Sequence, residues 1–425
     1  MPDQMSVRGV DDPIVHLEGY LDSAEPGPSI LAYTPDGLGL GHLRRNTNIA
    51  LRFARDTPSG NALVIGAWPT ALPAQSAPGV DFIKLPSLQK TTAQMWRSRS
   101  LRLELRRLIE IRSSMIVAAI EAFRPDIFLV DHSPIGSCGE LEPALDLLKQ
   151  RSIHSKATRT VLGLRDILDT PDHLCRAWER DGIYAALERY YDLILIYGEQ
   201  TVFDSAAQYG LNDLHGPKVK YCGYVGADEL QNCPDAVASQ SAPKNPKRLL
   251  IVGGGGSVAS PMMSTCIDAI DILSRGCELD CTLITGPLME RRERESLEKK
   301  AAGRPVVVTS YVDNPFDYIR KADLIVGMAG YNTLVETIAL RKKILVIPRG
   351  GFRAEQSLRA SIFAEKGYVT ASQSEDCSAP SLADSIRRCL DAQDPLQVKL
   401  NLNGLTTAVD ELRKMVTGAR HLQPI

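Results

Sequence analysis

The sequence predicts an α/β protein built from two domains, each a parallel sheet covered by helices on both faces. Short apolar runs of four to six residues recur along the chain. They lack the alternation of a half-exposed strand, which is typical of strands buried on both faces. Stretches with helical spacing separate these runs, and this alternation favours parallel sheets. A chain of 425 residues is long enough for two hydrophobic cores.

The apolar runs predict two sets of strands in chain order. The expected strands are Ser29–Tyr33, Ala62–Ile65, Ile127–Val130, Thr160–Leu164 and Leu193–Ile196, followed by Leu249–Val252, Cys281–Ile284, Val306–Thr309, Leu324–Gly327 and Ile344–Ile347. Expected helices between them include Ser98–Phe123, Gly139–Gln150, Met263–Ser274, Thr333–Leu340 and Leu382–Ala392.

A segment rich in proline and small polar residues predicts the domain boundary. Residues 231–246 contain three prolines and read as a linker. We therefore expect a first domain over residues 1–230 and a second over residues 247–400. Residues 401–425 carry apolar residues at helical spacing and predict a helix that can cross back to the first domain.

The overall composition limits the classes of function. A net charge of −2 gives no general attraction to nucleic acid. The nine cysteines are scattered, without a CxxC pair or a grouping of metal-ligand spacing, so we expect no metal site. That usage, the polar N-terminus without a signal-peptide pattern, and the lack of an apolar run of about 18–20 residues predict a cytoplasmic protein, at most peripheral to the membrane.

The second half carries a glycine loop directly after a predicted strand. Gly254, Gly255, Gly256 and Ser257 would let the backbone and a hydroxyl approach a diphosphate at a helix N-terminus. A tight turn without a ligand is the alternative. The loop also fits the dinucleotide fingerprint GxGxxA, but the next strand ends at Ile284-Thr285-Gly286 without the acidic residue that holds a ribose in NAD enzymes.

Two later helix starts carry polar groups at the same end of the predicted sheet. Asn332, Thr333 and Glu336 lie within one helical turn, where a carboxylate can accept hydrogen bonds from both hydroxyls of a ribose. Further along the chain, Glu355 and Gln356 can bind neighbouring sugar hydroxyls. The alternatives are a simple N-cap with a surface glutamate, and a solvated helix start.

In the first half, His42 ends a glycine loop and begins a helix. Its ordinary pKa lies near working pH, so it is a candidate general base. Asp131 and His132 follow another predicted strand, where Asp131 can orient an imidazole and His132 competes with His42 for the role of base. A purely structural histidine and a buried capping aspartate are the alternatives.

Two further features of the first half concern the acceptor and the surface. Arg165 and Asp166 follow a predicted strand and either contact an acceptor or form a local ion pair. The region from Lys90 to Arg112 predicts a basic amphipathic helix near residues 97–112, which can contact anionic lipid or an acidic acceptor. A solvated helix face is the alternative.

Taken together, these motifs resemble the GT-B glycosyltransferases of the family 28 type. The resemblance rests on Gly37–His42, Gly253–Ser257, the segment beginning at Tyr311, the block Asp323–Glu336, and the pair Glu355-Gln356. The stretch Phe123–Pro134 also resembles predicted glycosyltransferases without an assigned substrate. The first loop departs from the family's Gly-Gly-Thr-Gly-Gly-His type.

The resemblance implies a fold and a set of roles. It implies the GT-B fold, with two Rossmann-like doubly wound domains facing a central cleft. In this fold, Tyr311 and Val312 would hold the nucleobase of the donor, and Glu336 would bind its ribose. Glu355 and Gln356 would bind the transferred sugar. The diphosphate would lie on Gly254, Gly255, Gly256, Ser257, Gly330, Tyr331, Asn332 and Thr333. His42 would be the base, and the first loop with Gly39 and Gly41 would face the acceptor.

The predicted activity is a hexosyltransferase of class EC 2.4. It moves a sugar from a nucleoside diphosphate-sugar, a UDP-sugar in the first instance, to an acceptor hydroxyl or amine, with inversion and without a required cofactor or metal. Two alternatives stay open: a nucleotide-sugar 2-epimerase, and a non-catalytic subunit that binds a nucleotide-sugar or a polymer.

Overall fold

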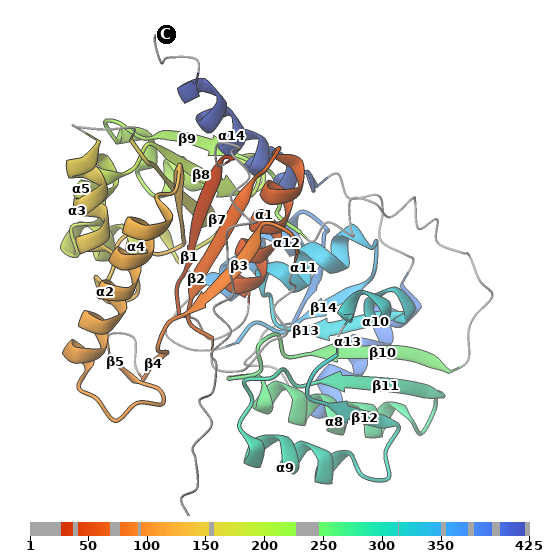
Figure 1. The fold of residues 1–425 in the computed structure, drawn as a ribbon. Helices are drawn as coiled ribbons and strands as arrows, with labels where there is room; N and C mark the ends of the chain where they lie inside the picture. The colour runs from red at the N-terminus through yellow and green to blue at the C-terminus, as the bar shows by residue number, and fades with distance from the viewer. Residues whose placement is uncertain are drawn as a thin grey trace, which may run out of the picture.

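The structure is a computed structural model that describes residues 27–36, 41–68, 77–91, 95–152, 157–226, 246–312, 314–349, 354–372, 378–392 and 400–420. These residues form two parallel sheets, each with helices on both faces, in two domains that pack against each other (Figure 1). The predicted linker 231–246 lies outside the described residues apart from its last position.

The first domain is built on a seven-stranded parallel sheet with the order β3-β2-β1-β6-β7-β8-β9. Its strands are β1 Ser29–Thr34, β2 Asn61–Gly66, β3 Val80–Lys84, β6 Ile127–Asp131, β7 Arg159–Arg165, β8 Leu193–Tyr197 and β9 Lys218–Tyr221. Its helices are α1 Gly41–Asp56, α2 Leu105–Phe123, α3 Glu142–Arg151, α4 Pro171–Arg180, α5 Ile183–Tyr190 and α6 Ser205–Gln208, with a 3-10 turn at Leu211–Asp213.

The second domain is built on a six-stranded parallel sheet with the order β12-β11-β10-β13-β14-β15. Its strands are β10 Lys247–Val252, β11 Leu279–Ile284, β12 Val306–Thr309, β13 Leu324–Gly327, β14 Ile344–Val346 and β15 Thr370–Ala371. Its helices are α8 Ser260–Leu273, α9 Arg291–Ala301, α10 Pro315–Lys321, α11 Tyr331–Ala339, α12 Glu355–Glu365 and α13 Ala379–Asp391. The last helix, α14 Gly404–Arg420, packs against α1 of the first domain (Figure 1).

All ten predicted strands are present, and most of them are apolar runs that the sheet buries. In β1, β6 and β8, nearly every residue is buried. The structure adds β3, β9 and β15, which lie at sheet edges and carry exposed or half-buried residues. These three segments lack a continuous apolar run and so carry no strand signal in the sequence, whereas the edge strand β12 is an apolar run and was predicted.

The predicted basic amphipathic helix near residues 97–112 is only partly present: residues 105–112 are helical, but residues 97–104 are not. An antiparallel hairpin, β4 Leu88–Lys90 with β5 Trp96–Ser98, occupies the first part of this region, and α2 begins only at Leu105. The Lys90 ammonium lies 5.4 Å from the centre of the Trp96 ring, a contact that joins the two strands. Arg112 is fully buried and pairs with Asp36 and Glu140, so it belongs to the core and not to a basic surface.

No helix among the described residues is both long and apolar enough to cross a membrane.

Buried polar contacts join the two domains. The Tyr331 hydroxyl, on α11, donates to the carbonyl of Tyr197 at 2.9 Å and accepts from the N–H of Val225 at 2.8 Å. The Arg359 guanidinium, on α12, contacts Asp166 after β7 at 2.9 Å, and both side chains are 1% exposed. A charge this deeply buried is stable only with its partner in place.

Replacing Arg359 with leucine should destabilise the protein strongly, because Asp166 would stay buried without its cation. Removing one partner of a buried ion pair costs about 3–5 kcal/mol. The measurement is denaturant unfolding of wild type and R359L. The exposed pair of Arg291 with Glu295 supplies the control: R291Q should change stability by no more than about 1 kcal/mol. Equal stability of R359L and R291Q would contradict the role given to this contact.

Candidate active site

The topology of each sheet brings two loops together at one edge. In a doubly wound sheet, ligands bind beyond the carboxyl ends of the strands, where the chain turns to opposite sides. In the first sheet this point lies between the neighbours β1 and β6, and in the second between β10 and β13. The first turn of α1 therefore meets the end of β6, and the glycine loop after β10 lies at the same sheet edge as the start of α11.

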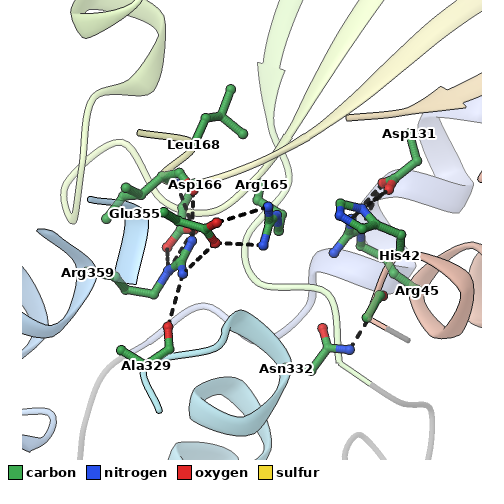
Figure 2. Close-up of polar contacts among 12 residues, drawn as sticks. His42, Arg45, Asp131, Arg165, Asp166, Leu168, Ala329, Asn332, Glu355 and Arg359 are labelled. Atoms are coloured by element: carbon green, nitrogen blue, oxygen red, sulfur yellow. Dashed lines mark hydrogen bonds and ion pairs between the residues drawn. The ribbon is translucent and has the colours of Figure 1, made fainter. Parts of the chain in front are cut away.

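At the first point, His42 contacts Asp131. His42 lies in the first turn of α1, and its Nδ1 is 2.5 Å from Oδ2 of Asp131 at the end of β6 (Figure 2). Arg45, one turn further along α1, donates to Oδ1 of the same carboxylate at 2.7 Å. A carboxylate at Nδ1 fixes the ring and leaves Nε2 available for proton transfer.

The surroundings keep this pair in its reactive charge state. Burial lowers the pKa of His42, although the charge and hydrogen bond of Asp131 act in the opposite direction. For Asp131, burial by itself raises the pKa, but the charges and hydrogen bonds of Arg45 and His42 outweigh it, and the pKa falls below its ordinary value. The imidazole is therefore neutral and the carboxylate ionised at neutral pH, as a general base requires.

His132 lies beside His42. The two ring centres are 4.9 Å apart and the rings are tilted by 38°. His132 adopts a left-handed backbone with φ of 66°, which is uncommon for residues other than glycine, although histidine adopts it more often than most. Asp131 contacts His42, so a carboxylate holds the ring of this candidate base.

At the second point, the glycine loop after β10 lies against the loop that follows β11. Gly254 and Gly256 have positive φ values of 59° and 97°. A Cβ on Gly256 would approach the carbonyl oxygen of Thr285 to 2.4 Å, so only glycine fits there. The loop leads into α8, whose first turn has free N–H groups.

Helix α11 begins at the neighbouring strand and carries the predicted ribose carboxylate. Glu336 is buried, and its Oε1 lies 2.7 Å from Nη1 of Arg44 in the first domain. The side chain of Asn332 approaches Gly41, with 3.5 Å between Nδ2 and the Gly41 carbonyl oxygen. The first turns of α1 and α11 therefore face each other across the two domains. The Tyr331 side chain is occupied at the domain contact described above.

The predicted sugar-binding pair starts α12. Glu355 is buried and forms two ion pairs, one with Arg165 of the first domain at 2.6 Å and one with Arg359 of its own helix at 2.9 Å. Figure 2 shows Arg165 between Glu355 and the His42–Asp131 pair. The Gln356 side chain accepts the backbone N–H of Arg349 at 3.2 Å, which holds the loop after β14.

A single cleft of about 2080 Å³ joins these groups. Every predicted donor residue lines it: Gly254, Gly255, Gly256, Ser257, Tyr311, Val312, Gly330, Tyr331, Asn332, Thr333, Glu336, Glu355 and Gln356. From the first domain, Gly41, His42, His132 and Arg165 line it. Asp131 lies behind His42. Asp166 is buried against Arg359 away from the cleft, and Gly39 lies outside the described residues.

Three arginines that shape the site were not predicted for it. Arg44 and Arg45 lie two and three residues after His42 and contact Glu336 and Asp131, respectively. Arg359 lies one turn after Glu355 and contacts Asp166. The only signal in the sequence was their position near predicted site residues at helix starts, which did not identify partners in another domain.

Among the described residues, no group of three or more histidine, cysteine, aspartate or glutamate side chains is arranged to hold a metal ion.

Known proteins resemble this chain in sequence over part of its length. Residues 249–412 match the glycosyltransferase family 28 C-terminal domain. The chain is 24% identical over 213 residues to the UDP-N-acetylglucosamine–N-acetylmuramyl-(pentapeptide) pyrophosphoryl-undecaprenol N-acetylglucosamine transferase of Geobacillus kaustophilus, covering 49% of this chain and 57% of the relative. It is 25% identical over 237 residues to an enzyme of the same description from Bacillus thuringiensis (strain Al Hakam), covering 54% and 62%. The match thus spans somewhat more than half the length of these relatives.

Solved structures resemble the whole chain. Acinetobacter baumannii MurG superposes with a TM-score of 0.58 at 14% identity, covering 91% of this chain and 99% of MurG. UGT2 of Phytolacca americana, complexed with UDP-2fluoro-glucose and pterostilbene, superposes with a TM-score of 0.57 at 12% identity, covering 92% and 100%. These likenesses and the two parallel sheets confirm the predicted GT-B fold. Residues 249–412 are therefore similar to a glycosyltransferase family 28 C-terminal domain, and the first domain completes the GT-B fold.

Proposed function

We propose that this protein transfers a hexose from a UDP-sugar to the hydroxyl or amine of an acceptor, with inversion at the anomeric carbon. One observation carries the proposal. The His42–Asp131 pair on one wall of the cleft faces, on the other wall, a glycine loop and two buried carboxylates, all in one continuous space. A base opposite a diphosphate site is what direct displacement at a sugar requires.

The second domain supplies the donor site. The N–H groups of the loop 253–257 and the first turns of α8 and α11 hold the diphosphate, because helix N-termini attract negative charge. Glu336 accepts hydrogen bonds from the ribose hydroxyls, and Tyr311 and Val312 hold the nucleobase. Glu355 and Gln356 bind the transferred sugar. The choice of nucleotide is supported by the relatives, which are described as UDP-N-acetylglucosamine transferases, and by the UDP-2fluoro-glucose in the Phytolacca complex.

The first domain supplies the base. Nε2 of His42 takes the proton from the acceptor O–H or N–H, and the acceptor atom forms a bond to the anomeric carbon from the side opposite the diphosphate. The bond from that carbon to the diphosphate oxygen breaks, and the leaving group departs with the electron pair. Asp131 holds the ring and stabilises the imidazolium that forms. The His132 ring lies next to the His42 ring that takes the proton.

The charge that develops on the leaving diphosphate falls on helix N-termini and loop N–H groups. These groups perform the task that a bound cation performs in other enzymes, so we propose turnover without a metal. Gly41 and Arg165 contribute to the acceptor side of the cleft, whereas the burial of Asp166 against Arg359 leaves it no contact with an acceptor. A UDP-sugar donor supports the proposal that the protein acts in the cytoplasm.

The hairpin side of the cleft supports a peripheral contact with anionic lipid. Met95, Leu101 and Leu103 are 59%, 46% and 41% exposed, although they are large apolar side chains. Basic residues follow or separate them: Arg97, Arg99, Arg102, Arg106 and Arg107. Exposed apolar groups among cations are the pattern of an interfacial segment.

Removing the base should stop transfer without unfolding the protein. His42→Ala should lower kcat by about 10²–10⁴-fold, which is the usual contribution of general base catalysis. Asp131→Asn should lower kcat in the same range, because the ring loses its orienting charge. The measurement is sugar transfer from a panel of UDP-sugars to an acceptor panel, with His215→Ala, an exposed histidine outside the cleft, as the control.

Two results would contradict this mechanism. Wild-type turnover in folded His42→Ala would remove His42 as the base. Conversion of the UDP-sugar to its 2-epimer in the absence of any acceptor would replace transfer with epimerisation.

The pH dependence follows from the lowered pKa of His42. A lowered pKa keeps the imidazole neutral, and hence basic, to more acidic pH than an ordinary histidine of pKa 6.5. The acidic limb of kcat/KM, which reports the free enzyme, should therefore have its midpoint below 6.5. In Asp131→Asn the midpoint should move lower still, because the charge of Asp131 raises the pKa of His42. A midpoint at or above 6.5 in the wild type would contradict this.

Lipid binding is testable by sedimentation with vesicles. The wild type should sediment with vesicles of phosphatidylglycerol and less with neutral phosphatidylcholine. A triple variant, Met95→Ser, Leu101→Ser and Leu103→Ser, should bind less while keeping its melting temperature, because all three side chains are exposed. Binding that is equal in the two proteins, or absent from both, would leave the basic segment as a solvated surface.

A further inference from the structure

We propose that Arg44 is a donor-binding residue supplied by the first domain, and that it moves from Glu336 to the diphosphate when the donor enters. The inference rests on the proposed function, because it assigns the ribose to Glu336. It adds a residue from the opposite domain to the donor site and links donor binding to the position of the base.

Arg44 already reaches into the second domain. It lies in the first turn of α1, yet its guanidinium contacts Glu336 on α11 at 2.7 Å and lies 5.2 Å from the centre of the Phe316 ring on α10. Its side chain is 34% exposed and lines the cleft, whereas Glu336 is 7% exposed. The arginine therefore approaches the ribose carboxylate from the open side, where the donor enters.

The charges of the two walls are unequal. Among the described residues that line the cleft, the second domain contributes one cation, Arg349, and two carboxylates, Glu336 and Glu355. The first domain contributes six cations and three carboxylates: Arg44, Arg45, Lys90, Arg99, Arg165 and Arg180, with Asp36, Asp169 and Asp181. The donor wall thus has a net charge of −1, although its ligand is a dianion. Side-chain charge to balance the diphosphate has to come largely from the facing wall.

Arg44 is suitably placed among those cations. Arg45 is held by Asp131, and Arg165 by Glu355. Arg44 is bound to the carboxylate that the ribose hydroxyls are to occupy. The first turn of α1 also faces the first turn of α11, as the approach of Asn332 to Gly41 shows. A guanidinium released from Glu336 has only to turn toward these two helix starts to meet a diphosphate, to which it can donate two hydrogen bonds.

When Arg44 moves from Glu336 to the diphosphate, both charged groups keep a hydrogen-bonding partner. The ribose hydroxyls donate to Glu336 in place of the guanidinium, and the guanidinium donates to the diphosphate. Because His42 precedes Arg44 by two residues on the same helix turn, a diphosphate that fixes Arg44 also fixes the start of α1. Donor binding then sets the distance between the base and the anomeric carbon, so Arg44 is a binding and positioning residue.

Calorimetric titration of the full chain with UDP and with uridine separates the two contacts of Arg44. In Arg44→Gln, the Kd for UDP should rise by about 10- to 100-fold, the usual effect of losing one charge-assisted contact. The Kd for uridine, which lacks phosphate, should fall or stay within about threefold, because Glu336 becomes available to the ribose. Arg44→Lys should lie between Arg44→Gln and wild type for UDP. Arg55→Gln, at the other end of α1 and outside the cleft, is the matched control.

The possible results of this titration distinguish failure of the inference from failure of the proposed function. If Arg44→Gln binds UDP and uridine more tightly by the same factor, Arg44 only blocks the site, and the inference is wrong. Unchanged UDP affinity in Arg44→Gln also overturns it, while the proposed function stands. A wild-type chain that binds no nucleoside diphosphate overturns the proposed function together with the inference.

Discussion

The Arg359 guanidinium is the contact on which the geometry of the cleft depends. It donates to Asp166 and to the carbonyl of Ile167 after β7, to the carbonyl of Ala329 before α11, and to Glu355 at the start of α12 (Figure 2). One buried cation thereby holds together a first-domain loop, the second-domain loop before α11 and the start of α12. A planar group with five donors suits this task, whereas lysine would satisfy fewer of these acceptors.

The same principle operates at the cleft surface. Both carboxylates assigned to the donor are buried and paired with arginines of the facing domain, Glu336 with Arg44 and Glu355 with Arg165. A buried carboxylate without a partner would be costly, so the arginines hold both carboxylates in place before any ligand arrives. Because the partners belong to the other domain, the proposed donor site is linked energetically to the first domain, which carries the proposed base.

Much of this arrangement could be predicted from the sequence, for identifiable reasons. Central strands such as Leu249–Val252 are continuous apolar runs, and the loop at Gly254–Ser257 needs glycine where the backbone turns through positive φ. Residues at the ends of such strands meet at one edge, which brought His42 and Asp131 together in the prediction as in the structure. Local pattern and sheet topology sufficed for these features.

Long-range partnerships between side chains could not be predicted. Asp166 and Arg359 are 193 positions apart, and nothing in either local pattern indicates the other. Arg165 and Asp166 are adjacent, yet the first lines the cleft and the second is buried behind it, because successive side chains at a strand end point to opposite sides. The hairpin formed by Leu88–Lys90 and Trp96–Ser98 was not predicted. Each strand is only three residues long and contains a basic residue, so neither shows the apolar run or the alternation that indicates a strand.

The central claim is that one cleft holds the nucleotide on the second domain opposite a base on the first. A crystal structure of the protein with UDP tests it most directly. The account predicts ribose hydroxyls within about 2.6–3.2 Å of Glu336. It also predicts the diphosphate at the glycine loop and the start of α11, on the side of the cleft that faces His42. A nucleotide bound outside this cleft, or bound within it with its ribose away from Glu336, would contradict the account.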